Sequence, residues 1–159
     1  MAFQTSVKTT PAIAQAGDFA SSNPRSVVVA PEGGFVAGTG GVTVGRFVWV
    51  QADGYTVLNT GSGVPDGFVH REQQALITAF LGETSNVVPA GLPVTVMRTG
   101  DYFATCTVGG ATRGQKAFAK LADGTMQAAN AGATVSGFVE TGFVIGRTAL
   151  VNEVTSITL

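Results

Sequence analysis

Three polar side chains in one short stretch have the types that a hydrolytic triad requires. Ser62 could act as the nucleophile, His70 as the base and Asp66 as the acid that orients the imidazole. All three lie close together in sequence, whereas triad members usually come from separated elements of a fold. We favour the plainer interpretation, in which Asp66-Gly67 is a turn and His70 begins the polar end of a strand.

Metal and redox chemistry have little support in the residue types. His70 and Cys106 are the only histidine and the only cysteine, and these two residues cannot by themselves complete a structural zinc site. The acidic residues are spread singly, whereas a calcium loop needs several oxygen ligands close in sequence. Cys106 lies in the apolar run 102–106, which predicts a small buried hydrophobic residue rather than a nucleophile. A single cysteine also excludes an intrachain disulfide, which fits a reducing compartment.

The glycine-rich segments lack the remaining parts of the nucleotide-binding motifs. Residues 38–43 begin like a dinucleotide fingerprint, but Thr43 occupies the position of the third glycine, and a strand follows. No glycine-rich segment ends in Gly-Lys-Ser or Gly-Lys-Thr, so the P-loop motif is absent. Thr60 replaces the first glycine of a nucleophile elbow around Ser62. We therefore expect no enzymatic activity, no cofactor and no metal ion.

The elements that carry these residues are predicted to be strands. Short β-branched and aromatic runs alternate with glycine turns, and Asp53-Gly54 and Asp123-Gly124 have the sequence of tight hairpin turns. This pattern predicts an all-β fold, either a single β-sandwich or a small β-barrel, with a jelly roll as one variant. Residues 46–50 are apolar on both faces, so a strand covered on both sides is expected, and a partner chain could provide the second cover. Residues 72–81 fit a short helix and a strand equally well.

The first 25 residues differ from the rest of the chain. Residues 1–25 show neither helical nor alternating periodicity, and Pro11 and Pro24 favour an extended backbone before them. A frayed terminus would have the same composition. The scattered single apolar residues favour an extended N-terminal arm that orders on a neighbour, followed by a β-rich domain over residues 26–159. These apolar residues are Phe3, Val7, Ile13 and Phe19.

Charge is scarce throughout. The chain has 9 Lys and Arg and 10 Asp and Glu in 159 residues, about half the share of an average soluble protein. A chain this poor in charge is expected to cover part of its surface with other chains. The net charge of −1 gives no reason to expect nucleic acid as a partner. No segment is apolar for the length of a membrane helix, and no apolar core precedes residues 14–16 as in a signal peptide.

Five segments stand in an order that is similar to a known family. They are residues 16–25 (AGDFASSNPR), 41–49 (GVTVGRFVW), 67–74 (GFVHREQQ), 89–96 (PAGLPVTV) and 114–119 (GQKAFA). Together they resemble the structural cement, or head-decoration, proteins of tailed bacteriophages. The resemblance spans most of the chain.

The resemblance implies a small β-rich protein on the outside of a phage head. Such a protein is made in the host cytoplasm, binds the major capsid protein lattice after expansion and bridges neighbouring capsomers. The resemblance further implies a dimer or trimer without enzymatic activity, and it supplies no catalytic residues. Our own inference places the capsid or oligomer interface at these residues: Phe3, Val7, Ile13, Phe19, Asn23, Arg25, Arg46 and Trp49.

A second hypothesis is a carbohydrate-binding or adhesin-like β-module of the virion or cell surface. It predicts an exposed aromatic cluster around Trp49, Tyr55 or Tyr102, because sugars stack on exposed aromatic rings. A small hydrolase at Ser62 and His70 remains the third hypothesis.

Overall fold

The described part of the chain is built from strands and turns alone. A computed structural model describes residues 14–72 and 85–159, which contain fourteen strands and no helix, and hence no helix that could span a membrane. The predicted all-β class is confirmed. Residues 73–81, where helix and strand seemed equally suitable, lie outside the described residues.

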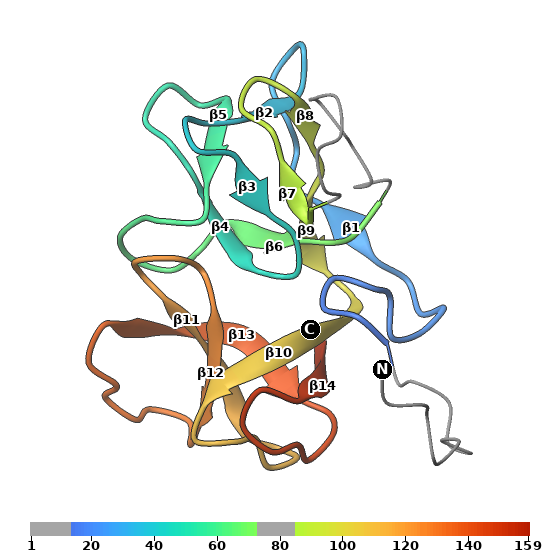
Figure 1. The fold of residues 1–159 in the computed structure, drawn as a ribbon, viewed down its shortest axis with the longest axis vertical. Coiled ribbons are helices and arrows are strands. Elements are labelled where there is room, and N and C mark those ends of the chain that lie inside the picture. The colour runs from blue at the N-terminus through green and yellow to red at the C-terminus, as the bar shows by residue number, and fades with distance from the viewer. Residues whose placement is uncertain (1–13, 73–84) are drawn as a thin grey trace, which may run out of the picture.

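The N-terminal half forms a seven-stranded sheet with a small two-stranded sheet beside it (Figure 1). The larger sheet has the order β1-β9-β6-β4-β5-β2-β8, and β3 pairs with β7. The strands are β1 (Ser26–Val27), β2 (Phe35–Ala37), β3 (Val42–Thr43), β4 (Phe47–Val50), β5 (Thr56–Leu58), β6 (Gly67–Val69), β7 (Val87–Val88), β8 (Pro93–Val94) and β9 (Val96–Thr99).

The C-terminal half forms a closed five-stranded barrel below these sheets in Figure 1. Its strands follow the order β10-β12-β11-β13-β14, and β10 joins the two halves because it directly follows β9. The strands are β10 (Asp101–Val108), β11 (Lys116–Lys120), β12 (Met126–Ala129), β13 (Phe138–Ile145) and β14 (Val154–Thr158). The region 26–159 is therefore made of two packed β units.

Both predicted hairpin turns are present. Asp53-Gly54 connects antiparallel β4 and β5, and Asp123-Gly124 connects antiparallel β11 and β12. Asp53 accepts hydrogen bonds from the backbone N–H groups that follow it, and Gly54 has φ +79°. Gly124 has φ +68°, and a Cβ atom there would lie 2.1 Å from the carbonyl oxygen of Phe47. Glycine at position 124 is therefore required both by the turn and by the close approach of the barrel to β4.

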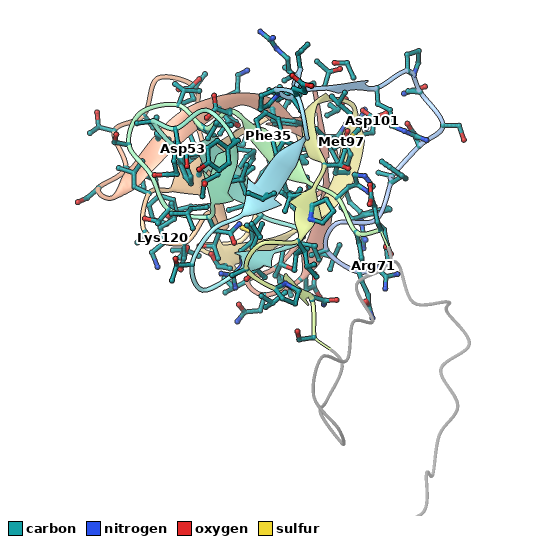
Figure 2. The ribbon with its side chains drawn as sticks, turned by 90° about the horizontal axis from the view of Figure 1, so that it is seen from above. Phe35, Asp53, Arg71, Met97, Asp101 and Lys120 are labelled. Atoms are coloured by element: carbon teal, nitrogen blue, oxygen red, sulfur yellow. The ribbon has the colours of Figure 1, made fainter. Side chains whose placement is uncertain are left out.

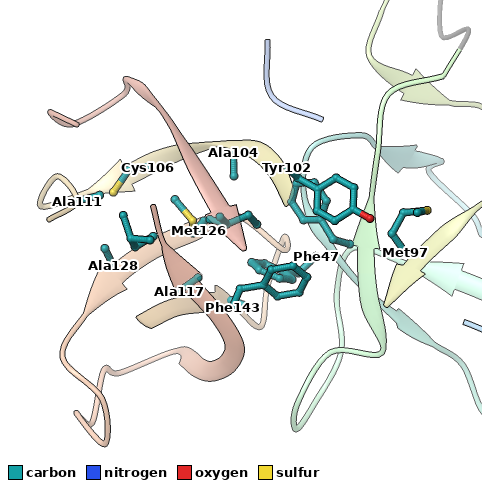
Figure 3. Packing of buried hydrophobic residues seen from close by; sticks show 14 of the residues in the cluster. Phe47, Met97, Tyr102, Ala104, Cys106, Ala111, Ala117, Met126, Ala128 and Phe143 are labelled. Carbon is teal, nitrogen blue, oxygen red and sulfur yellow. The ribbon is translucent and has the colours of Figure 1, made fainter. Parts of the chain in front are cut away.

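An aromatic cluster joins the sheet to the barrel. The ring of Phe68 packs 5.4 Å from Phe47 and 5.2 Å from Tyr102, and Phe143 from the barrel packs 5.7 Å from Phe47. Figure 3 shows Phe47, Tyr102 and Phe143 within this core. Phe47, Phe68 and Tyr102 are each fully buried. Burying side chains of this size contributes about 1.5–3 kcal/mol each, so the two halves are held by one shared core.

The strand at residues 46–50 is covered on both sides, as its sequence predicts. Phe47 and Trp49 of β4 belong to the core shared with the barrel, while Val48 belongs to a second, valine-rich core inside the sheet unit. The barrel of the same chain thus provides the second cover, for which a partner chain had been considered. The alternation of side chains along the strand sends successive residues to the two cores.

Candidate capsid interface

The triad residues do not assemble. The Asp66 carboxylate accepts a hydrogen bond from the backbone N–H of Val50 at 2.7 Å, and His70 Nε2 lies 3.0 Å from the carboxylate of Glu72. The Nδ1 atom of His70 is buried and has no hydrogen-bond partner in the described structure. Ser62 lies on an exposed loop, with no hydrogen bond to His70 in the described chain. The hydrolase hypothesis therefore has no geometric support.

The cysteine is buried, as its sequence context predicts. Cys106 is fully buried in the core of the barrel, and its thiol lies 3.4 Å from the carbonyl oxygen of Val108. Among residues 14–72 and 85–159, no three His, Cys, Asp or Glu side chains gather where they could hold a metal ion.

The exposed aromatic cluster expected of a sugar-binding module is not formed. Trp49 is only 4% exposed, and its indole N–H donates to the carbonyl of Gly63 at 2.9 Å. Tyr102 is fully buried and donates its hydroxyl to the carbonyl of Thr99, and burial raises its pKa to about 12. Tyr55 is half-exposed, but the other two rings lie in the core. That expectation is wrong, because both rings are needed to fill the space between sheet and barrel.

The described end of the arm lies along strand β10. Gly17 donates its N–H to the carbonyl of Phe103 at 2.7 Å, the N–H of Phe103 donates to Asp18 at 2.9 Å, and Ala20 donates to Asp101 at 2.9 Å. Phe19 forms an antiparallel bridge with Tyr102. Residues 17–20 thus pair with the body as an added strand, while Phe3, Val7 and Ile13 lie outside the described residues.

Two carboxylates fasten this end of the arm. Asp101 accepts side-chain hydrogen bonds from Ser21, Thr158 and Asn23, and these bonds lower its pKa below the usual value. Burial raises the pKa of Asp18, but the hydrogen bond and ion pair with Arg71 at 2.8 Å help to lower this pKa below its ordinary value. Figure 2 shows Arg71 and Asp101 on the same side of the molecule.

Most of the interface residues named from the sequence make contacts within the chain. Phe19 is 37% exposed, and its ring lies between the guanidinium of Arg25 at 3.9 Å and the imidazole of His70 at 4.7 Å. Asn23 donates to Asp101 at 2.6 Å. Arg46 is half-buried and points to the carbonyl of Asp123 at 3.4 Å. Phe19, Asn23 and Arg25 therefore hold the arm, and buried Trp49 is unavailable to a partner in this structure.

Apolar surface occurs at positions that the sequence reasoning missed. At the far end of the barrel, Val108, Leu150 and Val151 are 46%, 72% and 48% exposed, and we call them the barrel-tip patch. Their loops are held together by paired backbone hydrogen bonds between Ala111 and Ala149 at 2.8 and 2.9 Å. At the edge of the sheet, Val27 and Val29 are 51% and 89% exposed.

A groove of about 420 Å³ lies where the sheet meets the barrel. Its walls include Val28, Val64, Phe143 and Leu159, with Arg98 as the cation among them. Val64 and Leu159 are 66% and 51% exposed. Arg98 makes no ion pair with another described residue. The described residues therefore present exposed apolar side chains at three separate places, and each is a candidate surface for contact with another chain.

An all-β fold with exposed apolar side chains and few charges is typical of a protein that assembles with other chains. Comparison with known proteins identifies the assembly. The chain belongs to the XM1 gp53 minor capsid protein family, whose match covers residues 3–159. It is a structural accessory protein of a bacteriophage capsid and a component of the virion.

The fold agrees with this assignment. A chain from the solved capsid of Myoviridae phage XM1 is similar to it with a TM-score of 0.66 and 20% identity, covering 99% of this chain and 97% of that one. At this identity the likeness shows a shared fold. No curated protein matches the chain.

Proposed function

We propose that this protein is a cement protein that binds the outside of the phage head. It binds the major capsid protein, bridges neighbouring capsomers and stabilises the expanded shell, with self-association as a dimer or trimer. A shell under internal pressure fails where its subunits part, and a clip that buries area across the junction raises the free energy of that opening. Many copies of modest affinity suffice, because each acts on its own seam.

The barrel-tip patch is the observation that carries this proposal. Leu150 is 72% exposed although it is a large apolar side chain, and Val108 and Val151 extend the same surface. Exposed Arg113, Arg147 and Glu153 lie in the same two loops, and the Glu153 carboxylate accepts a hydrogen bond from the Leu150 N–H at 2.9 Å, so charged groups of both signs surround the apolar surface. An apolar centre with a polar rim is the usual anatomy of a protein interface. The patch lies at the end of β10 that is remote from the sheet. The eight residues of β10 separate its two ends by about 23 Å.

The arm supplies the second contact in this proposal. Phe3, Val7 and Ile13 precede in sequence the segment that is fastened to β10, and we propose that they contact a neighbouring subunit. Phe19 instead anchors the arm to its own body through the rings of His70 and Tyr102. A partner contact through an extended segment buries much surface for its length, although ordering the segment reduces the net affinity.

Charge insertion at the barrel tip tests the proposal. Leu150→Asp places a carboxylate in the proposed contact, and we expect its binding to expanded heads that lack the protein to weaken by at least about tenfold. Val64→Asp is the matched control, because Val64 is similarly exposed at 66% but lies in the groove. Co-sedimentation with heads gives the affinities. Equal binding of Leu150→Asp and wild type, or no binding of wild type, would contradict the proposal.

Truncation tests the role of the arm separately. A chain that starts at residue 14 keeps every described contact to β10, whereas one that starts at Arg25 loses the hydrogen bonds of Gly17, Asp18 and Ala20. We expect the first truncation to fold normally and to bind heads more weakly than the full chain. If it binds heads as well as the full chain, the arm has no part in capsid binding.

A further inference from the structure

One edge of the seven-stranded sheet carries exposed valines and no charged side chain. Strand β1 is the outermost strand, with β9 as its neighbour on one side. Val27 and Val29 are 51% and 89% exposed, and residues 26–30 contain no charged side chain. Proteins usually protect such an edge with lysine, a bulge or a covering loop, because an open apolar edge pairs with other strands. This edge has no lysine, and its only protection is that β1 is two residues long with a bulge between Ser26 and Val27. That protection leaves the valine side chains beyond the bulge exposed, where another strand can cover them.

The backbone of this segment is oriented for pairing. Val28 donates its N–H to the carbonyl of Val96 at 2.8 Å, and the N–H of Ser26 points to the Thr99 hydroxyl at 3.1 Å. Because backbone groups of successive residues in a strand point to opposite edges, the N–H and C=O groups of Val27 and Val29 face away from β9. Val29 makes no backbone hydrogen bond with another described residue.

The sequence of the segment is nearly palindromic. Residues 26–30 read Ser-Val-Val-Val-Ala, with identical residues on either side of Val28 and small residues at both ends. Any strand can pair with a second copy of itself about a twofold axis perpendicular to the sheet, and the near-palindrome places like residues opposite each other. With Val28 on the axis, Val27 of one copy lies opposite Val29 of the other, which pairs all the outward backbone groups in one register.

We infer that this segment pairs in antiparallel fashion with the same segment of a second copy. The pairing makes the sheet continuous across a dimer. In each copy, Val27 lies against Val29 of the other copy and Val29 lies against Val27. Arg25 precedes the segment and Glu32 follows it, so antiparallel pairing brings the cation of each copy to the acidic end of the other. Pro31 has no N–H group and ends the ladder beyond Val29.

The inference names the self-association surface within the proposed function and leaves the barrel tip free for the capsid. It rests on the edge geometry, and its test does not need capsids. Opposite residues of this register have Cα atoms about 4.5 Å apart at the axis, within the range that a disulfide spans. The native cysteine, Cys106, is buried and does not compete in the folded protein.

Disulfide trapping tests the register. Val28→Cys is expected to form a covalent dimer under mild oxidation at least about tenfold faster than Ser26→Cys, whose two sulfurs lie about 13 Å apart along the strands. The double variant Ser26→Cys with Ala30→Cys restores the reaction, because residue 26 faces residue 30 of the partner. This second variant involves exposed positions only and remains informative if Val28→Cys folds poorly. Equal rates for Ser26→Cys and both other variants would overturn the inference.

Charge at the edge gives an independent measurement. Val29→Lys introduces the residue that commonly protects open edges, and we expect the dimer dissociation constant from analytical ultracentrifugation to rise at least about tenfold. Val151→Lys is the matched control on the barrel tip and leaves the dimer unchanged. A wild-type protein that sediments as a monomer, or as a trimer insensitive to Val29→Lys, contradicts the pairing. Head binding by wild type would still support the cement role in either case.

Discussion

Replacing Asp101 with alanine should release the arm from the barrel. The carboxylate accepts side-chain hydrogen bonds from Ser21 and Asn23 on the arm and from Thr158 at the end of β14. Charge-assisted hydrogen bonds are worth about 1.5–3 kcal/mol each when buried. Because this site is partly exposed to solvent, we take about 2 kcal/mol for the set. That amount corresponds to roughly a 30-fold increase in the opening equilibrium of the arm.

Amide hydrogen exchange measures this opening directly. The N–H groups of Gly17 and Ala20 are bonded to the carbonyls of Phe103 and Asp101, so their protection reports whether the arm is paired. In Asp101→Ala we expect exchange at both amides to accelerate by roughly 30-fold. Amides in the hairpin of β11 and β12 should keep the wild-type rates, because they lie in the barrel core.

Asp53→Ala is the matched control. Like Asp101, Asp53 is a hydrogen-bonded carboxylate with a lowered pKa, caused chiefly by the hydrogen bonds that it accepts from Thr56. Its donors, Thr56 and the N–H of Tyr55, lie within its own turn. It should leave the exchange of Gly17 unchanged. If Asp101→Ala also leaves Gly17 and Ala20 protected, the side-chain contacts do not hold the arm, and the reasoning fails.

Three further predictions concern the core, one turn and acid. Phe68→Ala should destabilise the protein by about 3–5 kcal/mol in thermal denaturation, because Phe68 is fully buried between sheet and barrel. Gly124→Ala should cost about 2 kcal/mol more than Gly132→Ala, since both glycines have positive φ but only position 124 lacks room for Cβ. Acid should open the arm, because Asp101 and Asp18 have lowered pKa values. Their contribution to the stability of the paired arm is complete above pH 3.8, their ordinary pKa, and is lost as the pH falls through the lowered values.

Each of these predictions has a result that would count against it. A Phe68→Ala loss no larger than that of Val64→Ala, which removes an exposed side chain, would mean that the shared core does not join the halves. Equal denaturation midpoints for the two glycine variants would show that the barrel turn can move away from β4. For acid, the quantity compared is the protection of the Gly17 amide relative to its intrinsic exchange rate at each pH. A loss of this protection in acid that is as large in Asp101→Asn as in wild type would exclude Asp101 as the titrating group.

Local patterns in the sequence predicted the local structure well. Asp53-Gly54 and Asp123-Gly124 form the expected hairpins because their turn geometry depends on only a few adjacent residues. The burial of Cys106 followed from the apolar run around it. The alternation of residues 46–50 also predicted two covered faces, since strand periodicity is a local property.

Long-range contacts could not be predicted in the same way. Ser21 and Asp101 are 80 residues apart, and nothing in either neighbourhood indicates that they meet. The closure of β10 with β14 into a barrel likewise depends on pairing distant strands. Trp49 was expected at an interface, but a single tryptophan in an apolar strand is compatible with core or surface. Val29 has the residue type of a core strand, and only its place at the sheet edge exposes it.

The most direct test of the cement role is the temperature at which expanded heads release their DNA. Heads that lack the protein are measured before and after addition of the purified wild-type chain, with bound copies counted for each sample. We predict that binding raises the release temperature in proportion to the occupied sites, and that Leu150→Asp at the same concentration fails to do so. Full occupancy with an unchanged release temperature would contradict the claim that this protein clamps the shell.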